Sequence, residues 1–252
     1  MTKKELAPKI ILYTFPSEES DSLLNNIVAV IDGDKAILVD TAYDDQMKLV
    51  LEDLNANGVT IERVIISHFH EDHCDGLNVL PDVPFYGGAN FKETLVFEGC
   101  EDDIAKYTPT IVVDKPMAIE FGKHKLELIP FRGHSECTML TKINEQFLQI
   151  ADEVMLTNDG GLSLPWLCNG EANVKRQRQL SAWDKLKDYS DFTIIPAHGQ
   201  AFDGDKLHGY LRNLEGYLNA IVESDGNIAY EDAIKNCDYP FSKSRFHENN
   251  CK

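Results

Sequence analysis

Short apolar runs separated by turn signals dominate the chain. Most have the length of a strand, about four to eight residues, and are rich in Val and Ile. Runs of this kind predict β-strands, because branched side chains pack well on a pleated surface. The predicted strands cover residues 9–15, 26–31, 36–39, 64–67, 111–113, 117–121, 123–130, 138–143, 147–151 and 192–197.

Apolar residues at helical spacing fill several segments between these strands. The predicted helices cover residues 44–57, 89–107, 175–189, 205–224 and 230–236. The strands form two groups, each accompanied by helices, and an apolar sheet face must be covered by another layer. The pattern therefore predicts an α+β protein, an αββα four-layer sandwich. No Pro/Gly/Ser-rich linker interrupts it, so we expect a single domain over residues 1–252 with a C-terminal helical extension from about residue 205.

Five of the apolar strands are followed closely by a side chain that can bind or support a metal ion. In chain order, these residues are Asp40, His68, His134, Asp152 and His198. Strand ends are rigid, and the loops that leave them can converge on one point. We therefore expect a site along one edge of the sandwich.

The segment His68-Phe69-His70-Glu71-Asp72-His73 places four strong metal ligands in six positions. In an extended chain, residues two apart face the same way, whereas on a helix they diverge. We therefore expect an extended segment in which His68, His70 and Asp72 line one wall. His73 would point elsewhere and serve a second ion.

The charge of the chain restricts its partners. Its 24 basic and 42 acidic side chains give a formal net charge of −18. Such a surface repels phosphate backbones and anionic lipids, so we expect neither a nucleic-acid nor a membrane partner. The polar start of the chain lacks a secretory apolar segment, and no apolar run is long enough to span a membrane. We therefore expect a cytoplasmic protein.

The cysteine pattern agrees with a reducing compartment. Six cysteines are spread along the chain without a CxxC pair, as expected for free thiols in the cytosol. Cys74 directly follows the metal-ligand cluster, and we expect it to be a small buried apolar side chain.

Several motifs, taken in order, resemble those of the metallo-β-lactamase superfamily. The segment from His68 to His73 is similar to the family's HxHxDH signature. The motifs that resemble its first aspartate, third histidine, bridging aspartate and last histidine are Leu38-Val39-Asp40-Thr41, Ile129-Pro130-Phe131-Arg132-Gly133-His134, Ile150-Ala151-Asp152 and Ile195-Pro196-Ala197-His198-Gly199. The resemblance implies the αββα fold of that family and a metal-dependent hydrolase.

The resemblance also implies a ligand set for two metal ions. The ligands would be His68, His70 and His134 for the first ion and Asp72, His73 and His198 for the second. Asp152 and a water-derived hydroxide would bridge the ions, and Asp40 would orient the ligands without binding metal itself. Imidazole and carboxylate donors suit two Zn²⁺ ions, and Fe or Mn is also compatible with them.

Within the superfamily, the full ligand set is most similar to the glyoxalase II and lactonase-like branch. This similarity implies a hydrolase whose bridging hydroxide cleaves a small-molecule thioester, ester or lactone. Asp72 would act catalytically by orienting the nucleophile and relaying its proton. One alternative is a persulfide dioxygenase-like enzyme with a single iron, although residues 153–156 lack the arginine-bearing pattern of that branch. Another is a metal-binding protein with little turnover.

Charge at the predicted centre suggests the kind of substrate. Two divalent cations, offset by Asp72, Asp152 and hydroxide, leave a local formal charge of about +1. We therefore expect a small-molecule substrate, and such a centre can attract one that carries a carboxylate.

Two segments are candidates for the substrate pocket. The long loop over residues 157–174 either lines the pocket through Trp166 and Leu167 or is a structural crossover. His247 lies in a tail that can fold back over the mouth of the site. Nothing in the pattern predicts an oligomeric state.

Overall fold

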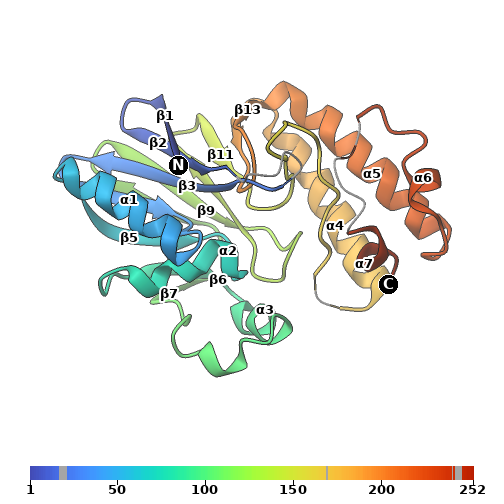
Figure 1. The fold of residues 1–252 in the computed structure, drawn as a ribbon, viewed down its shortest axis with the longest axis horizontal. Coiled ribbons are helices and arrows are strands. Elements are labelled where there is room, and N and C mark those ends of the chain that lie inside the picture. Colours follow the sequence, from blue (N-terminus) through green and yellow to red (C-terminus); the bar gives the residue numbers. More distant parts are fainter. Residues whose placement is uncertain (17–21, 169, 240, 242–245) are drawn as a thin grey trace.

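Two β-sheets and their covering helices build the protein (Figure 1). The computed structural model describes residues 1–16, 22–168, 170–239, 241 and 246–252. The first sheet has the strand order β1-β2-β3-β4-β5-β6-β7. Its strands are β1 (Thr2–Ala7), β2 (Ile10–Phe15), β3 (Asn25–Asp32), β4 (Lys35–Val39), β5 (Thr60–Ile66), β6 (Phe85–Gly88) and β7 (Ile111–Val113).

The second sheet has the strand order β13-β12-β11-β10-β9-β8. Its strands are β8 (Met117–Phe121), β9 (His124–Pro130), β10 (Met139–Ile143), β11 (Phe147–Gln149), β12 (Thr193–Ile195) and β13 (Phe202–Asp203). Both sheets are mixed, since β4 pairs in parallel with β5 and β11 with β12, whereas most other neighbours are antiparallel.

Helices follow the strands of each half. They are α1 (Asp44–Ala56), α2 (Glu71–Cys74), α3 (Phe91–Phe97), α4 (Ala172–Leu186), α5 (Leu207–Glu223), α6 (Tyr230–Ala233) and α7 (His247–Cys251). Four short 3₁₀ helices cover Asp75–Val79, Glu101–Asp103, Lys187–Tyr189 and Gly204–Lys206. None of the helices in the described part of the chain is long and apolar enough to cross a membrane.

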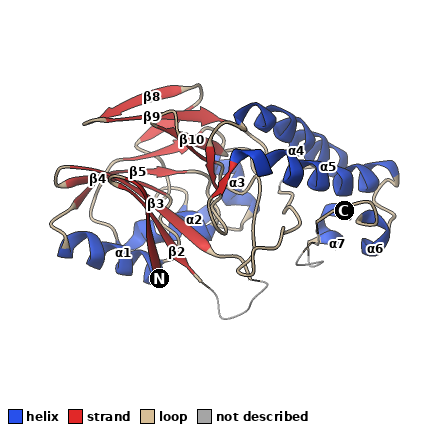
Figure 2. Cartoon of the chain, turned by 90° about the horizontal axis from the view of Figure 1, so that it is seen from above, coloured by secondary structure: helices blue, strands red, loops and turns tan. Residues whose placement is uncertain are grey.

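Three clusters of buried apolar side chains separate four layers. The central cluster joins the two sheets, with Val30 and Ile37 from the first and Leu126 and Met139 from the second. A second cluster packs α1 and α3 against the outer face of the first sheet. A third packs α4 and α5 against the second sheet. Figure 2 shows the sheets one above the other, and the predicted αββα sandwich is confirmed.

Three strands have no counterpart in the predicted set. β1 carries the polar sequence Thr-Lys-Lys-Glu-Leu-Ala, which lacks the apolar alternation of a half-buried strand because this strand lies at the exposed edge of its sheet. β6 contains two glycines, and an added Cβ at Gly87 or Gly88 would overlap neighbouring atoms, so β6 requires residues of low strand propensity. β13 has only two residues.

Two other expectations need correction. The helix predicted over residues 89–107 is only α3 followed by a 3₁₀ turn, because Gly99 adopts a left-handed φ of 73° that ends the helix. The ligand segment is nonhelical only as far as His70, which is the N-cap of α2. Asp72 and His73 therefore lie in a helical turn, and the prediction of an extended segment was wrong for this half.

Candidate metal centre

Loops at the ends of the strands in both sheets bring the predicted ligands together. His68 and His70 follow β5, Asp72 and His73 lie in α2, and the ligands from the second sheet are His134 after β9, Asp152 after β11 and His198 after β12. Arg132 and Ala151 adopt left-handed φ angles of 44° and 48°, which are uncommon for residues other than glycine. Gly199 follows His198 with a φ of 99°. Sharp turns thus direct these side chains inward instead of continuing the strands.

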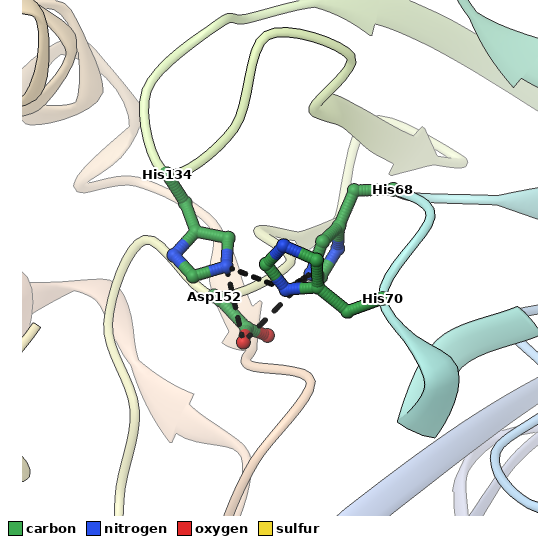
Figure 3. A group of neighbouring side chains, drawn as sticks. All are labelled: His68, His70, His134 and Asp152. Carbon is green, nitrogen blue, oxygen red and sulfur yellow. Dashed lines mark hydrogen bonds and ion pairs between the residues drawn. The ribbon is translucent and has the colours of Figure 1, made fainter. Parts of the chain in front are cut away.

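The first group of donor atoms comprises His68, His70, His134 and Asp152 (Figure 3). His70 Nδ1 lies 3.1 Å from both His68 Nε2 and His134 Nε2. Asp152 Oδ2 lies 3.6 Å from His134 Nε2 and 3.9 Å from His68 Nε2. Ligand atoms bound to one Zn²⁺ ion at tetrahedral angles lie about 3.3 Å apart, so this group has the spacing of a first metal site.

The second group comprises Asp72, His73 and His198. The Asp72 carboxylate lies 3.4 Å from His73 Nε2 and 3.4 Å from His198 Nε2. Asp152 also contacts this group, with Oδ1 at 3.4 Å from His73 Nε2 and Oδ2 at 3.2 Å from His198 Nε2. Asp152 therefore lies between the two groups, where a bridging carboxylate would be placed.

Unsatisfied polar atoms indicate that the centre is built for cations. His73 Nε2 and Asp152 Oδ1 are buried and make no hydrogen bond to any described residue. Burying such atoms without a hydrogen bond is costly, and a bound cation would satisfy both. The donor set therefore fits the pair of metal ions that the sequence resemblance implies.

Burial keeps three of the imidazoles neutral. It lowers the pKa of His68 and His70 well below the usual value for histidine, and neighbouring histidines add to the effect. Burial also lowers the pKa of His134 to about 4. All three rings are uncharged at pH 7 and can offer a nitrogen lone pair to a metal ion.

Neighbouring carboxylates raise the pKa of the other two imidazoles, those of His73 and His198. Burial alone would lower the pKa of His73, but Asp72 and Asp152 raise it well above the usual value. Burial would also lower the pKa of His198, but the nearby Asp152 carboxylate outweighs this effect and raises it. Burial would raise the pKa of Asp152, yet His198 and His73 hold it well below the usual value. A bound cation would replace the protons that these carboxylates stabilise on His73 and His198.

A hydrogen-bond network centred on Asp40 fixes the orientation of two ligands. Asp40 accepts bonds from the Ser67 backbone N–H at 2.7 Å and the Ser67 hydroxyl at 2.9 Å. It also accepts from His73 Nδ1 and Gln149 Nε2, both at 3.2 Å. The Ser67 oxygen in turn lies 3.1 Å from His68 Nδ1. Both rings are therefore held with Nε2 facing the centre, as expected of a group that supports ligands without binding metal.

A second buried carboxylate supports the loop that carries His134. Glu153 accepts a 2.8 Å bond from the His134 backbone N–H and a 2.6 Å bond from Gln179 Nε2. A Cβ at Gly133 would overlap the Glu153 carboxylate, so the loop requires glycine there. Burial raises the pKa of Glu153 to about 7. Sequence reasoning missed Glu153, although its place directly after Asp152 was a usable signal.

Two further side chains contact Nε2 of His70, whereas its Nδ1 faces His68 and His134. His70 Nε2 lies 3.5 Å from Glu98 Oε1 and 3.5 Å from Cys168 Sγ. The Cys168 sulfur is also 3.9 Å from His134 Nε2. No sequence motif marks either residue, because both reach the centre through contacts between segments far apart in the chain.

A cavity of about 280 Å³ opens onto the centre. Its lining includes the ligands His70, Asp72, His134, Asp152 and His198, the acidic side chains of Glu71 and Glu98, Tyr43, and the apolar side chains of Leu23, Met155, Trp166 and Phe246. The lining therefore combines apolar and aromatic side chains with acidic ones.

The three residues predicted at the substrate pocket take different positions. Trp166 lines the cavity, whereas Leu167 is 2% exposed and packs into the helical core. His247 bonds to Tyr217 and to the Ile228 carbonyl instead of facing the cavity. Its neighbour Phe246 lines the cavity in its place. Cys74 is buried in the core between α1 and the first sheet.

Comparison with known families finds one match. The family model described as "Metallo-beta-lactamase superfamily" matches residues 21–198, which include all seven predicted ligands. No curated protein of significantly similar sequence was found.

Solved structures share the fold at low sequence identity. The metallo-beta-lactamase from Pontibacter korlensis is 17% identical with a TM-score of 0.69, over 84% of this chain and 99% of that protein. The DIM-1 metallo-beta-lactamase exposed to ceftazidime is 20% identical with a TM-score of 0.65, over 85% and 95% of the two chains. The sec-alkylsulfatase Pisa1 from Pseudomonas sp. is 16% identical with a TM-score of 0.65, over 89% of this chain and 42% of its own.

Replacing Asp40 should weaken metal binding without removing any predicted ligand. In Asp40→Ala, His73 loses the acceptor that holds its ring, so we expect metal affinity to fall about 10- to 100-fold. Competition with a chromophoric chelator measures this affinity. Asp53→Ala is the matched control, because Asp53 bonds to Tyr13 and Lys3 away from the centre. A folded Asp40→Ala protein with unchanged affinity would contradict the assigned role.

Metal binding should release protons. The raised pKa values of His73 and His198 favour their protonated rings, whereas metal binding requires the neutral rings. Metal affinity should therefore rise with pH and fall as the pH is lowered. Calorimetry of Zn²⁺ binding in two buffers of different ionisation enthalpy tests this expectation. Equal heats in both buffers would show that no proton leaves.

Proposed function

The chain belongs to the metallo-beta-lactamase superfamily, and from this premise we propose that it is a dinuclear metallohydrolase acting on a small-molecule thioester, ester or lactone. The position of Asp152 carries the proposal. Its carboxylate contacts both donor groups, so one side chain can bridge two ions. The second group, Asp72, His73 and His198, is complete, which favours two ions over the single iron of a dioxygenase.

The ligands favour zinc. All seven donors are imidazole nitrogens or carboxylate oxygens, which Zn²⁺ binds in closely spaced sites, although Fe and Mn also accept such ligands. When bound, the two cations would supply a water-derived hydroxide as nucleophile near neutral pH and polarise the substrate carbonyl.

Asp72 is the catalytic residue of the proposal. Its carboxylate lies at the pocket surface with 26% of the side chain exposed, whereas His73 and His198 beside it are buried. Either carboxylate oxygen can accept a proton from the attacking water and pass it to the leaving group. His73 and His198, 3.4 Å away on either side, hold the carboxylate facing the cavity.

The cavity sets the size and polarity of the substrate. A volume of about 280 Å³ suits a small organic molecule. The apolar side chains of Leu23, Met155, Trp166 and Phe246 would contact its acyl or leaving group. No lysine or arginine is among the described residues of the lining, so a substrate carboxylate, if present, would be held by the cations themselves.

Free thiols support a cytoplasmic location. All six cysteines are unpaired, as expected in a reducing compartment.

Metal loading and a substrate panel test the proposed activity. We expect about two equivalents of zinc per chain by elemental analysis, together with chelator-sensitive hydrolysis of at least one thioester, ester or lactone. Oxygen consumption with a persulfide by the iron-loaded protein, without hydrolysis of the panel, would contradict the proposal. So would full activity in protein free of transition metal.

Replacing Asp72 tests its proposed role in catalysis. In Asp72→Ala, kcat should fall about 10²- to 10⁴-fold, because both a ligand and the proton acceptor are lost. His208→Ala is a control for the loss of an exposed polar side chain, since His208 lies on the solvent side of α5. Full kcat in metal-loaded Asp72→Ala would rule out this role.

A further inference from the structure

The pocket wall that contains Trp166 belongs to neither a helix nor a strand. Residues 165–168 are irregular, yet Pro165, Leu167 and Cys168 are buried. Buried backbone groups need hydrogen-bond partners, and an irregular segment must obtain them from other parts of the chain. The hydrogen-bond partners of this segment therefore determine the position of the pocket wall.

Asn250 in α7 supplies two of these partners. Its side-chain oxygen accepts a bond from the Leu167 backbone N–H at 3.4 Å, and its Nδ2 donates to the Pro165 carbonyl at 2.8 Å. The same Nδ2 lies 3.2 Å from the hydroxyl of Tyr217 in α5. Asn250 is fully buried. Its amide thus brackets Trp166 from both sides while a core tyrosine holds the amide itself.

The bonds from Asn250 to Pro165 and Leu167 form a clamp on the segment, and neighbouring residues of α7 extend it. Asn249 Nδ2 donates to the Leu167 carbonyl at 3.1 Å. Three carbonyls at the end of α7 are held from α4, because Lys175 donates to that of Asn249 and Arg176 to those of Asn250 and Cys251. Such terminal carbonyls lack partners within their own helix. The two cationic side chains therefore anchor α7 to the larger helical layer.

The clamp shapes the cavity on two sides. Phe246, the N-cap of α7, lies edge-on to Trp166 with ring centroids 5.0 Å apart, and both rings line the cavity. Beyond Trp166 the segment reaches Cys168, whose sulfur contacts His70 and whose carbonyl accepts a bond from Arg178. The wall is thus fixed at one end beside the metal ligands and elsewhere by α7.

We infer that Asn250 is a positioning residue for the substrate pocket, so that α7 determines which acyl or leaving groups the site accepts. Asn250 touches neither a metal ligand nor the cavity in the described structure. It acts through the backbone on either side of Trp166. The effect on substrates rests on the proposed hydrolase function, whereas the effect on the wall does not.

Tryptophan fluorescence tests the inference without a substrate. The chain has two tryptophans, and Trp183 is fully buried with its Nε1 bonded to the Glu153 carbonyl, so quenching by acrylamide reports on the partly exposed Trp166. In Asn250→Ala, the quenching constant should rise about twofold, with metal content unchanged. Trp166→Phe should remove the quenchable signal and identifies its source.

Kinetics on any substrate found in the panel supply the second readout. In Asn250→Ala, KM should rise about tenfold while kcat stays within about twofold, because two hydrogen bonds to the wall are lost and the metal ligands keep theirs. Glu248→Ala is the matched control, since Glu248 lies on the same helix, is 81% exposed and pairs only with Lys252 among the described residues. We expect this control to leave both quenching and KM unchanged.

The outcomes separate the two proposals. Wild-type quenching in a folded Asn250→Ala protein would overturn the positioning role, even if the protein hydrolyses esters. Increased quenching with no hydrolysis in the wild type would support the positioning role and contradict the proposed function. If Asn250→Ala does not fold, Asn249→Ala decides, because among the described residues its side chain bonds only to the Leu167 carbonyl. A smaller rise in quenching is then expected, and its absence overturns the role.

Discussion

Desolvation of the donor cluster is the constraint on which the site depends. Five imidazoles and the Asp152 carboxylate are buried within a few ångströms of one another, and only Asp72 is partly exposed. Removing so many polar groups from water is unfavourable unless each is paired, yet within the described part of the chain His73 Nε2 and Asp152 Oδ1 make no hydrogen bond. Bound cations would repay this cost, so the free energy of metal binding would also stabilise the folded loops.

The sandwich makes such crowding possible because the ligands rest on two rigid sheets. Asp40 ties the loop after β4 to the loop after β5 through Ser67. Asn26, in β3 of the first sheet, holds the loop that carries His198 in the second. Its Nδ2 donates to the carbonyls of Pro196 and Gly199 on either side of His198. Four of the predicted ligands, His68, His73, His134 and His198, are therefore supported by buried hydrogen bonds that cost free energy to break, which holds their donor atoms close together.

Sequence patterns could predict which side chains come together because most of these residues closely follow apolar strands. The seven predicted ligands lie in two neighbouring groups, since a strand end and the residue after it are adjacent in both sequence and space. The same reasoning could not place Glu98, Cys168 or Asn250, which meet the site through contacts between distant segments. It also failed for the turn after His70, where a polar segment of four residues offers no periodicity from which to recognise a helix.

Metal binding and substrate selection are divided between different parts of the chain. All seven ligands fall within residues 21–198, the region that matches the superfamily model, whereas α7 and Phe246 lie outside it. The ligands depend on strand ends and on Asp40, so changes in α7 need not displace a metal ion. The wall at Trp166 depends on Asn250, so the same changes alter the cavity. The shape of the pocket wall can therefore change without displacing the predicted ligands, because separate hydrogen-bond networks hold the two.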